Sequence, residues 1–398
     1  MTISPLADYF KSLLVIETAT ILAGPSVGMF LAELGATVIK VENLRTQGDT
    51  TRRWKLPTET TESDVSAYFS AVNWGKRSIG LDLAQPAHQQ ILHDLLSRAD
   101  IFLHNFRAFA LQKFKLDEAR LRALNERLIC AQVTAYGEDD PRPGFDAILQ
   151  AETGFTAING LPDGEPTKMP VALIDVLLAH QMKEALLLAL LERNLTGRGQ
   201  TVSLSLFQAG LSSLVNQATN YLVGQTVPQR RGSDHPNISP YGTIFRTKDQ
   251  QEIVLAVGTE IQFQKLTEIL DCVALLGDSR FQSNSARVAH NAELKAILAE
   301  RIAQFERDAL LNRLHTAQIP AGAVRAIDAD LFAQPQAQAL LLQAETSAGQ
   351  PLMGVRSVAF PTSAVNPAEG LSAPPHFDQD RDYVLRELLQ YSDEQVAK

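Results

Sequence analysis

The stretch SLLVIETATILAGPSVGMFLAELGATVIKVE, residues 12–42, decides the fold class of this chain. Ser12–Glu17 is apolar and strand-like, Pro25–Leu34 has apolar residues at helical spacing, and Ala36–Glu42 has the pattern of a second strand. A strand, a crossover helix and a second strand make a compact βαβ unit, in which the two strands are parallel. The N-terminal part of the chain is therefore expected to hold a parallel sheet.

The same alternation continues over the first two hundred residues. Strand-like segments lie at Ser78–Leu83, Ile101–His104 and Leu128–Val133, and helix-like segments lie at Ala87–Arg98 and Asp117–Asn125. This pattern predicts an α/β fold with a Rossmann-like, doubly wound large domain, whose ligands bind at the carboxyl ends of the strands. The GxGxxG fingerprint is absent after the first strand, which disfavours a nicotinamide dehydrogenase.

The second half of the chain has a different character. Gly224–Pro240 is polar and rich in Pro, Gly and Arg, as in a linker or binding loop, and a smaller α+β domain follows it. In that domain Thr243–Arg246 and Glu252–Val257 predict a hairpin, and helices are expected near Glu260–Leu270, Ala292–Gln304 and Glu306–Ala317. A helix-like Gln208–Leu222, an exposed helix over Gln334–Gln343 and closing helices in Asp378–Lys398 complete the expected elements. The predicted domain order is large domain 1–223, linker 224–240, small domain 241–317, linker 318–334 and the rest of the large domain 335–398.

Composition limits the possible functions. With 398 residues the chain can form two domains, and its net charge of −9 argues against a general nucleic-acid surface. Cys130 and Cys272 lie in apolar contexts without CxxC spacing, which indicates buried free thiols in a reducing cytoplasm. We find neither a signal peptide nor 18 consecutive apolar residues, so a cytoplasmic protein without a membrane span is expected. The motifs GxxxxGK[ST], GxSxG and HExxH and zinc-ligand pairs are missing, so kinase, serine-hydrolase and metalloprotease functions lack support and no metal site is expected.

Asp175 is the one carboxylate in the apolar stretch MPVALIDVLLA, Met169 to Ala179. A charge in such surroundings must be hydrogen-bonded, paired or used in chemistry, which makes Asp175 a candidate nucleophile or base. The structural alternative is an N-cap between a short strand, Met169–Ile174, and a helix, Val176–Glu192. Both interpretations place the carboxylate beside free backbone N–H groups that can hold a developing oxyanion.

Several fragments in a fixed order carry a family resemblance. They are LAGPSVGMFLAELGATVIKVE, GDTTRRW, GKRSIGLDL, HNFR, the Asp175 segment, TGRGQTVSLSLFQA and APPHFDQDRDYVLRELLQYSDEQVA. In these fragments the chain resembles the family III CoA-transferases, which include formyl-CoA transferase, carnitine CoA-transferase and α-methylacyl-CoA racemase. The resemblance covers nearly the whole chain.

The resemblance implies a mechanism and an assembly. The aspartate that matches Asp175 attacks an acyl-CoA thioester to give an aspartyl anhydride; the CoA thiolate then gives an aspartyl-CoA thioester, which activates an acceptor acid. No cofactor is bound permanently, because the CoA thioester is a substrate. The family fold is an interlaced, ring-like homodimer. Asp175 is expected to be ionised, which the N-terminus of a helix favours.

The resemblance also implies binding residues for CoA. Asn43 departs from the arginine found there in formyl-CoA transferase, and Arg45 lies two residues away with a guanidinium that can reach a phosphate. Lys113 stands where the family often has a basic residue for the CoA phosphates. The positions that match CoA-binding loops are Leu22, Ala23, Asn43, Arg45, Leu81, Asn105, Phe106, Arg107, Lys113, Ala135 and Tyr136.

An acceptor pocket is implied at four further positions. Trp54 and Tyr68 match residues near the acyl or acceptor group, although large aromatic side chains also serve as core or interface residues. Asp234 and His235 align with the start of a mobile glycine-rich loop, whose run of glycines is absent here. The basic residues Arg230 and Arg231, together with His235, can hold a second carboxylate, which favours succinyl-CoA and a short dicarboxylic acid as substrates.

Two alternatives to the transferase remain open. Acyl-CoA racemases carry a GHDINY-like segment whose histidine moves a proton, whereas this chain has PGFDAILQ with Phe145 at that place. A phenyl ring cannot act as a base, and His180, five residues after Asp175, falls on another face of the same helix. The second alternative is a catalytically inactive CoA-binding protein, against which the retained Asp175 argues.

Overall fold

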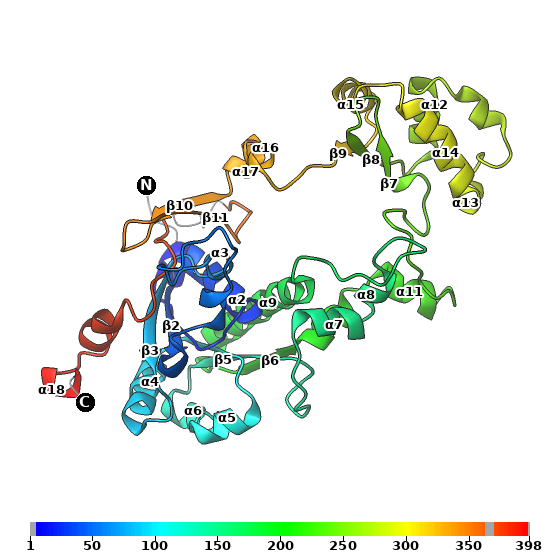
Figure 1. Ribbon diagram of the computed structural model, residues 1–398. Coiled ribbons are helices and arrows are strands. Elements are labelled where there is room, and N and C mark those ends of the chain that lie inside the picture. The colour runs from blue at the N-terminus through cyan, green and yellow to red at the C-terminus, as the bar shows by residue number, and fades with distance from the viewer. Residues whose placement is uncertain (1–4, 363–369, 397–398) are drawn as a thin grey trace. The chain divides into compact units, whose positions relative to one another are not determined.

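The computed structural model describes residues 5–362 and 370–396 and divides the chain into two compact units (Figure 1). The first unit comprises Met1–Thr153, Met169–Ala218 and Gln338–Lys398, and the second comprises Gly154–Lys168 and Thr219–Ala337. The second unit thus includes a short segment that precedes Asp175 in sequence, whereas the sequence pattern assigned all of residues 1–223 to one domain. The expected mixed α/β class is confirmed.

A six-stranded sheet forms the centre of the first unit, and each neighbouring pair of strands in it is parallel. The spatial order is β3-β2-β1-β4-β5-β6. The chain therefore adds β2 and β3 on one side of β1 and then β4, β5 and β6 on the other, so the strand order switches between β1 and β4. Ligands of open parallel sheets bind at the carboxyl ends of the strands near such a switch. The strands are β1 (Leu14–Glu17), β2 (Thr37–Asn43), β3 (Lys76–Leu81), β4 (Ile101–His104), β5 (Ile129–Thr134) and β6 (Thr201–Ser205).

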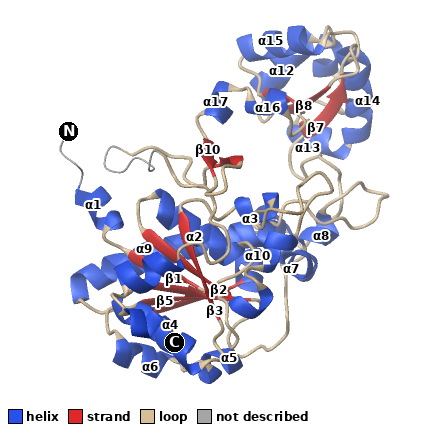
Figure 2. Cartoon of the chain, turned by 60° about the vertical axis from the view of Figure 1, so that its left-hand side comes forward, coloured by secondary structure: helices blue, strands red, loops and turns tan. Residues whose placement is uncertain are grey.

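Helices cover both faces of this sheet (Figure 2). On one face α2 (Ala23–Glu33) and α9 (Leu173–Thr196) pack against each other. On the other face α4 (Pro86–Arg98), α6 (Glu118–Leu124) and the helix Tyr383–Leu388 share an apolar core with alternate residues of the strands. The remaining helices of this unit are α1 (Pro5–Lys11), η1 (Leu44–Thr46), η2 (Thr50–Arg53), α3 (Ala67–Ser70), α5 (Ala108–Lys113), α7 (Asp146–Glu152), α10 (Leu206–Ser212), α17 (Pro335–Gln338, which reaches its boundary) and α18 (Asp393–Val396).

The free edge of β3 is covered by the C-terminal segment rather than by another strand. The Asp378 carboxylate accepts the N–H of Gly80 at 2.8 Å, and the Asp380 carboxylate accepts the N–H of Ser78 at 2.9 Å. A side chain at Gly80 would meet the ring of Phe377 at 2.7 Å, so only glycine fits there. These carboxylates satisfy the edge donors and block pairing with a further strand.

Two of the expected helices do not form as predicted. Residues 334–343 do not form one helix, because a hairpin of β10 (Leu341–Glu345) and β11 (Pro351–Val355) follows the short α17. The residues between these strands supply a turn at Gly349, where φ is +78°. The segment 208–222 is likewise two helices, α10 and α11 (Asn216–Leu222), since Val215 between them has a left-handed φ of +48°.

The second unit is a small α+β structure. Strands β7 (Tyr241–Arg246), β8 (Glu252–Ala256) and β9 (Ala321–Ala323) form an antiparallel sheet. The expected hairpin and the three expected helices are present, and their apolar side chains form one core with Phe245, Phe263 and Phe281. Its helices are α8 (Phe155–Ile158), α12 (Glu260–Ile269), η3 (Val273–Gly277), α13 (Asn284–Ala289), α14 (Asn291–Ile302), α15 (Arg307–Thr316) and α16 (Ala329–Phe332). Among the described residues no helix combines the length and apolar character that a membrane crossing requires.

Candidate active site

The N-termini of α2 and α9 both lie at the carboxyl edge of the parallel sheet. Helix α2 begins at Ala23, directly after the loop that follows β1. Helix α9 ends just before β6, and its last turn is tied to the amino edge of the sheet because Arg193 pairs with Asp100 at 2.9 Å. Since the two helices pack side by side, their positive ends point toward the same region.

Asp175 lies in the first turn of α9 with its side chain 8 % exposed. Within the described residues its carboxylate accepts no hydrogen bond and forms no ion pair, and Ala172 occupies the N-cap position. The predicted strand over residues 169–174 is absent, and the prediction that Asp175 is the N-cap is wrong. The carboxylate is therefore buried and unpaired, which is costly for a structural residue and useful for a nucleophile.

The capping role belongs to Asp146 on α7. Its Oδ1 accepts the N–H of Ile174 in the first turn of α9 at 2.8 Å, and its Oδ2 accepts the side-chain amide of Gln150 at 2.7 Å. Gln150 in turn accepts the N–H of Met169 at 2.7 Å and donates to the carbonyl of Val171 at 3.2 Å. The irregular segment before α9 is thus held by α7 rather than by a strand.

This arrangement controls the acidity of Asp175. Burial, and then the negative charge of Asp146, raise the pKa of Asp175 from 3.8 to about 7. Both causes act against the ionised form, which the N-terminus of a helix was expected to favour. Near neutral pH a substantial fraction of Asp175 is therefore protonated in the free protein.

Trp54 and Tyr68 lie on the same side of the unit as Asp175. Burial, followed by the charges of Asp175 and Asp146, raises the pKa of the half-buried Tyr68 phenol. The ring of Trp54, which is exposed, packs edge-to-face on Tyr68 with ring centroids 5.0 Å apart. The two aromatic residues and the carboxylate are thus brought together, as a site for an acyl or acceptor group requires.

The candidate CoA-binding residues other than Lys113 lie at the carboxyl ends of strands or in the loops that follow them. The loops that follow β1 and β4 are in contact, because the side-chain amide of Asn105 donates to the hydroxyl of Thr20 at 3.3 Å. The Arg142 guanidinium covers the ring of Tyr136 at 3.8 Å. Leu22 and Ala23 follow β1, Asn43 ends β2, Leu81 ends β3, Asn105, Phe106 and Arg107 follow β4, Ala135 and Tyr136 follow β5, and Lys113 is the last residue of α5.

Asn43 and Arg45 have local roles at the end of β2. The Asn43 side chain accepts the N–H of Arg45 at 2.9 Å and so caps η1. The Arg45 side chain is largely exposed, and its Nε donates to Asp82 at 2.9 Å. Arg45 therefore presents an exposed guanidinium at the carboxyl edge, whereas its partner Asp82 is buried and also accepts the N–H of Ala84 at 3.0 Å.

The donors of the first turn of α2 remain open. Leu22, at the N-cap, provides no side-chain acceptor, and the N–H groups of Ala23 and Gly24 meet no acceptor among the residues described. Unsatisfied N–H groups at a helix start bind anions or developing oxyanions.

Asp234 and His235 belong to the second unit. The Asp234 carboxylate accepts a hydrogen bond from the side-chain amide of Asn291 at 3.0 Å and pairs with the Lys295 ammonium at 3.4 Å. The Nδ1 of His235 accepts the N–H of Asn237 at 3.1 Å, and its ring packs edge-to-face on Tyr241. Both side chains thus stabilise their own loop.

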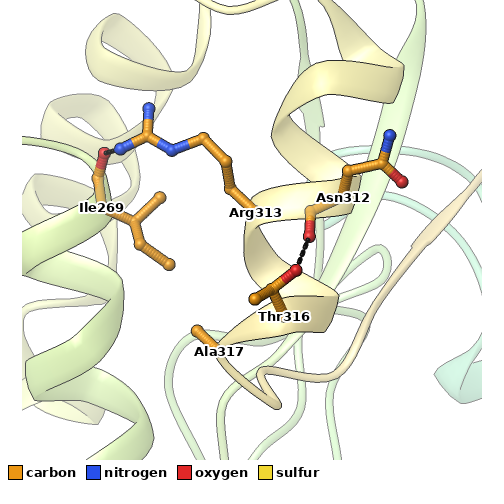
Figure 3. A pocket seen from close by; sticks show the side chains of 5 residues that line it. All are labelled: Ile269, Asn312, Arg313, Thr316 and Ala317. Carbon is orange, nitrogen blue, oxygen red and sulfur yellow. Dashed lines mark hydrogen bonds between the residues drawn. The ribbon is translucent and has the colours of Figure 1, made fainter.

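A surface hollow of about 420 Å³ in the second unit offers no chemistry (Figure 3). It is lined by Ile269, Asn312, Arg313, Thr316 and Ala317. Arg313 is already bound to the carbonyl of Ile269, and Thr316 to the carbonyl of Asn312. In residues 5–362 and 370–396, no group of three or more His, Cys, Asp and Glu side chains is placed to hold a metal ion.

Comparison with known proteins identifies the family. The model of CoA-transferase family III matches residues 10–381. The chain belongs to this family. It is 39 % identical over 351 residues to the succinate–glutarate CoA-transferase of Agrobacterium fabrum, covering 86 % of this chain and 87 % of that protein. It is 32 % identical over 389 residues to the succinyl-CoA:glutarate CoA-transferase of Mus musculus, covering 96 % and 87 %.

A solved structure gives the same result for the fold. The crystal structure of a CAIB/BAIF family protein from Brucella suis matches with a TM-score of 0.83 and 36 % identity, covering 98 % of this chain and 100 % of that one. The protein is therefore a family III CoA-transferase, and the resemblance noted in its sequence is confirmed. Asp146 and Gln150 are the two residues of its candidate site that the sequence analysis missed. The sequence signal for them is the segment FDAILQ, in which a carboxylate in the first turn of a helix is followed four residues later by an amide.

Proposed function

We propose that this family III CoA-transferase moves CoA from succinyl-CoA to a short dicarboxylic acid such as glutarate, with Asp175 as the covalent nucleophile. The observation that carries the mechanism is the Asp175 carboxylate, which is buried, unpaired among the described residues and in the first turn of α9. The substrates rest on the relatives, whose names specify succinate, succinyl-CoA and glutarate.

The first half of the reaction would transfer the acyl group to the enzyme. One Asp175 oxygen attacks the thioester carbonyl carbon, the C–S bond breaks, and an aspartyl succinyl anhydride and a CoA thiolate result. The thiolate then attacks the aspartyl carbonyl carbon of the anhydride. The C–O bond to the succinyl group breaks, succinate leaves, and Asp175 carries CoA as a thioester.

The second half reverses these bond changes with the acceptor. A carboxylate oxygen of the dicarboxylic acid attacks the aspartyl thioester, and the thiolate leaves. The thiolate then attacks the acceptor carbonyl of the new anhydride, which releases the product thioester and restores the Asp175 carboxylate. No net proton is consumed, so the site needs an ionised aspartate and a dry pocket rather than a general base.

The negative charge that develops in each tetrahedral intermediate needs donors. The free N–H groups of Ala23 and Gly24 at the start of α2 are suited to this role, because preorganised backbone donors stabilise an oxyanion without reorganisation. The residues at the other strand ends, with Arg45 and Lys113 as the cations, would hold the nucleotide part of CoA.

The aromatic side chains of Trp54 and Tyr68 are our candidates for the walls of the acyl and acceptor pocket. Trp54 and Tyr68 would cover the acyl chain next to Asp175. We propose that Arg230, Arg231 and His235, in a loop of the second unit that Asp234 fixes through Asn291, can bind a carboxylate of the substrate.

Racemisation is disfavoured by the residues around Asp175. Phe145, at the position of the racemase histidine, is the N-cap of α7 with an exposed ring, and the charged group that acts on Asp175 is Asp146. His180 is exposed, whereas Asp175 is buried. Neither residue offers a base that could share a proton with Asp175.

The interlaced homodimer remains our proposal for the assembly. The outer face of α9 supports it, because Leu187, Leu188, Leu191 and Leu195 are 42–76 % exposed on one helix. A contiguous apolar face of this kind is typical of a buried interface. The two free, buried thiols, Cys130 and Cys272, are consistent with the reducing cytoplasm that we propose as its location.

The decisive experiment is CoA exchange from succinyl-CoA to glutarate, followed by mass spectrometry. The wild-type protein should form glutaryl-CoA, and hydroxylamine should trap an adduct on the peptide that contains Asp175. Asp175→Ala should lose activity by several orders of magnitude, whereas Asp8→Ala, at an exposed aspartate of α1, should not. Retention of a tenth of the wild-type rate by Asp175→Ala would exclude it as the nucleophile.

A further inference from the structure

Four charged side chains are fully buried beneath the loop that follows β1. Glu17 at the end of β1 pairs with Lys40 of β2 at 3.1 Å and with Lys76 of β3 at 2.8 Å, and Lys40 also pairs with Asp49 at 3.2 Å. All four side chains are at most 1 % exposed. Two buried cations and two buried anions cost much desolvation energy for a fold that could use apolar residues instead.

This ion cluster makes three bonds to the backbone of one short segment. The Nζ of Lys40 donates to the carbonyl of Ala19 at 3.0 Å. The Oδ2 of Asp49 accepts the N–H of Ile21 at 3.0 Å. The Nζ of Lys76 donates to the carbonyl of Pro25 at 2.8 Å. The cluster therefore holds the start and the middle of the loop 19–23 and, through Pro25, the first turn of α2 that follows it.

The middle of this loop is strained. Ile21 has φ of +77°, a left-handed conformation that is a genuine outlier for a β-branched residue. Such a conformation persists only where surrounding structure imposes it, and it is concentrated at functional sites. The bond from Ile21 N–H to Asp49 is the contact that fixes the peptide on the N-terminal side of this residue.

Burial and the neighbouring charges shift the pKa values of Asp49 and Lys76. Burial would raise the pKa of Asp49, but Lys40 and the hydrogen bonds of Thr51 and Ile21 outweigh it and hold that pKa below its usual value. Burial, opposed by Glu17, lowers the pKa of Lys76 to about 8. Gly28 of α2 leaves the room that the cluster needs, because a Cβ there would lie 1.8 Å from Glu17 Oε2.

We propose that this ion cluster is a positioning device for catalysis, in which Asp49 holds Ile21 in its left-handed conformation and thereby aims the free N–H groups of Ala23 and Gly24 at the reacting carbonyl. The inference rests on the proposed function, since it takes the first turn of α2 as the oxyanion site. Asp49 touches no reacting atom in this scheme and acts through the loop.

The chain supplies a matched control at the other end of β1. Asp100 accepts the N–H of Leu14 at 2.8 Å and pairs with the buried Arg193 at 2.9 Å. It thus resembles Asp49 in accepting a backbone N–H next to β1 and in pairing with a buried cation. It lies at the amino edge of the sheet, away from the proposed oxyanion donors. Asp100→Asn should therefore loosen the same strand without moving the loop 19–23.

The test compares Asp49→Asn with Asp100→Asn in the full-length protein. Both variants should melt at lower temperature than wild type. Asp49→Asn should lower kcat for CoA exchange by about 10- to 100-fold, with KM for succinyl-CoA changed less than about threefold. Asp100→Asn should keep kcat within about twofold. Hydrogen exchange of the peptide that spans residues 18–24 should accelerate in Asp49→Asn and not in Asp100→Asn.

Two outcomes would overturn the proposal: a folded Asp49→Asn protein with kcat within twofold of wild type, or unchanged hydrogen exchange in its loop. If the wild-type protein exchanges no CoA, the proposed function fails, and hydrogen exchange still decides whether the cluster holds the loop. If Asp49→Asn does not fold, a pair of variants at Ile21 decides, because both leave all four charges in place.

Ile21→Gly can keep a positive φ and the N–H that binds Asp49, whereas Ile21→Pro can keep neither. Ile21→Gly should retain kcat within about fivefold, and Ile21→Pro should lose as much as the Asp49 variant. Equal kcat values for the two Ile21 variants would refute the positioning role.

Discussion

Replacement of Asp175 by Asn should make the protein more stable at pH 8 while it removes the activity. The Asp175 side chain is 8 % exposed, and its pKa is raised from 3.8 to about 7, by burial first and by Asp146 second. One pKa unit corresponds to about 1.4 kcal/mol. The buried charge therefore costs the folded state roughly 4 kcal/mol above pH 7, as an order of magnitude.

The sign follows from proton binding. The folded state holds the Asp175 proton more tightly than the unfolded chain does, so stability is lost as the pH rises from about 4 to about 7. Below pH 4 the group is protonated in both states and contributes no difference. The Asn variant does not titrate, so its advantage over wild type should grow across this window and level off near pH 8.

The assay is thermal unfolding of both proteins from pH 4 to pH 8.5. For a unit of this size a gain of roughly 4 kcal/mol corresponds to roughly 5–8 °C in Tm. Asp8→Asn, which removes an exposed charge from α1, gives the baseline for the loss of one carboxylate. Mass spectrometry of each sample checks that the new amide has not deamidated. A Tm difference that is flat with pH, or an Asn variant less stable than wild type at pH 8, would refute the account of Asp175.

Three further outcomes are expected. Asp146→Asn should move the acid limb of the kcat/KM profile for CoA exchange to lower pH, because the Asp146 charge is one of the two causes that raise the pKa of Asp175; an unmoved limb would contradict this. Incubation with a 2-methylacyl-CoA in deuterated water should give no exchange at the α-carbon, since Phe145 replaces the racemase histidine, and rapid deuterium uptake would favour the racemase instead. The protein should remain dimeric on dilution until it unfolds, as threaded chains require, and a reversible equilibrium with a folded monomer, seen by analytical ultracentrifugation, would exclude the interlaced architecture.

The sheet was predictable because its strands are buried on both faces. Segments such as residues 101–104 and 128–133 are short apolar runs between helical patterns, and in the structure they are β4 and β5 with nearly the same bounds. The hairpin of β10 and β11 was missed because its two strands are only half-buried. In composition, the residues around 334–343 resemble an exposed helix as much as a strand.

The start of α9 was mispredicted for a different reason. An apolar run that ends in an aspartate is the local pattern of a strand followed by an N-cap, and nothing within the run contradicts it. The true cap, Asp146, comes from another helix, and Gln150 takes the backbone of residues 169–171 that a neighbouring strand would have paired. Contacts between segments far apart in the chain are not visible in local periodicity.

The sequence of β2 contains a pattern that indicates buried charges. Lys40 and Glu42 occupy alternate positions in VIKVE, and such residues on a one-sided sheet would face water. In a sheet covered on both faces the same positions are buried, so each charge there must find a partner near the strand ends. The sequence thus implied buried ion pairs once a doubly wound sheet was inferred, although it could not pair Lys40 with Glu17 and Asp49.

In the proposed mechanism Asp146 caps α9 and Asp175 attacks the thioester, and there is a chemical reason for two different residues in these roles. A carboxylate that accepts the N–H groups of its own helix has its charge stabilised and its pKa lowered, and it becomes a weaker nucleophile for the same reason. Because Asp146 satisfies α9 at Ile174, Asp175 is left without a donor and is more basic. The consequence is a carboxylate that is partly protonated near pH 7 and destabilises the fold when it ionises. An aspartate at position 175 that capped its own helix would be less basic and would attack the thioester more slowly, so the covalent mechanism that we propose requires the cap to come from Asp146.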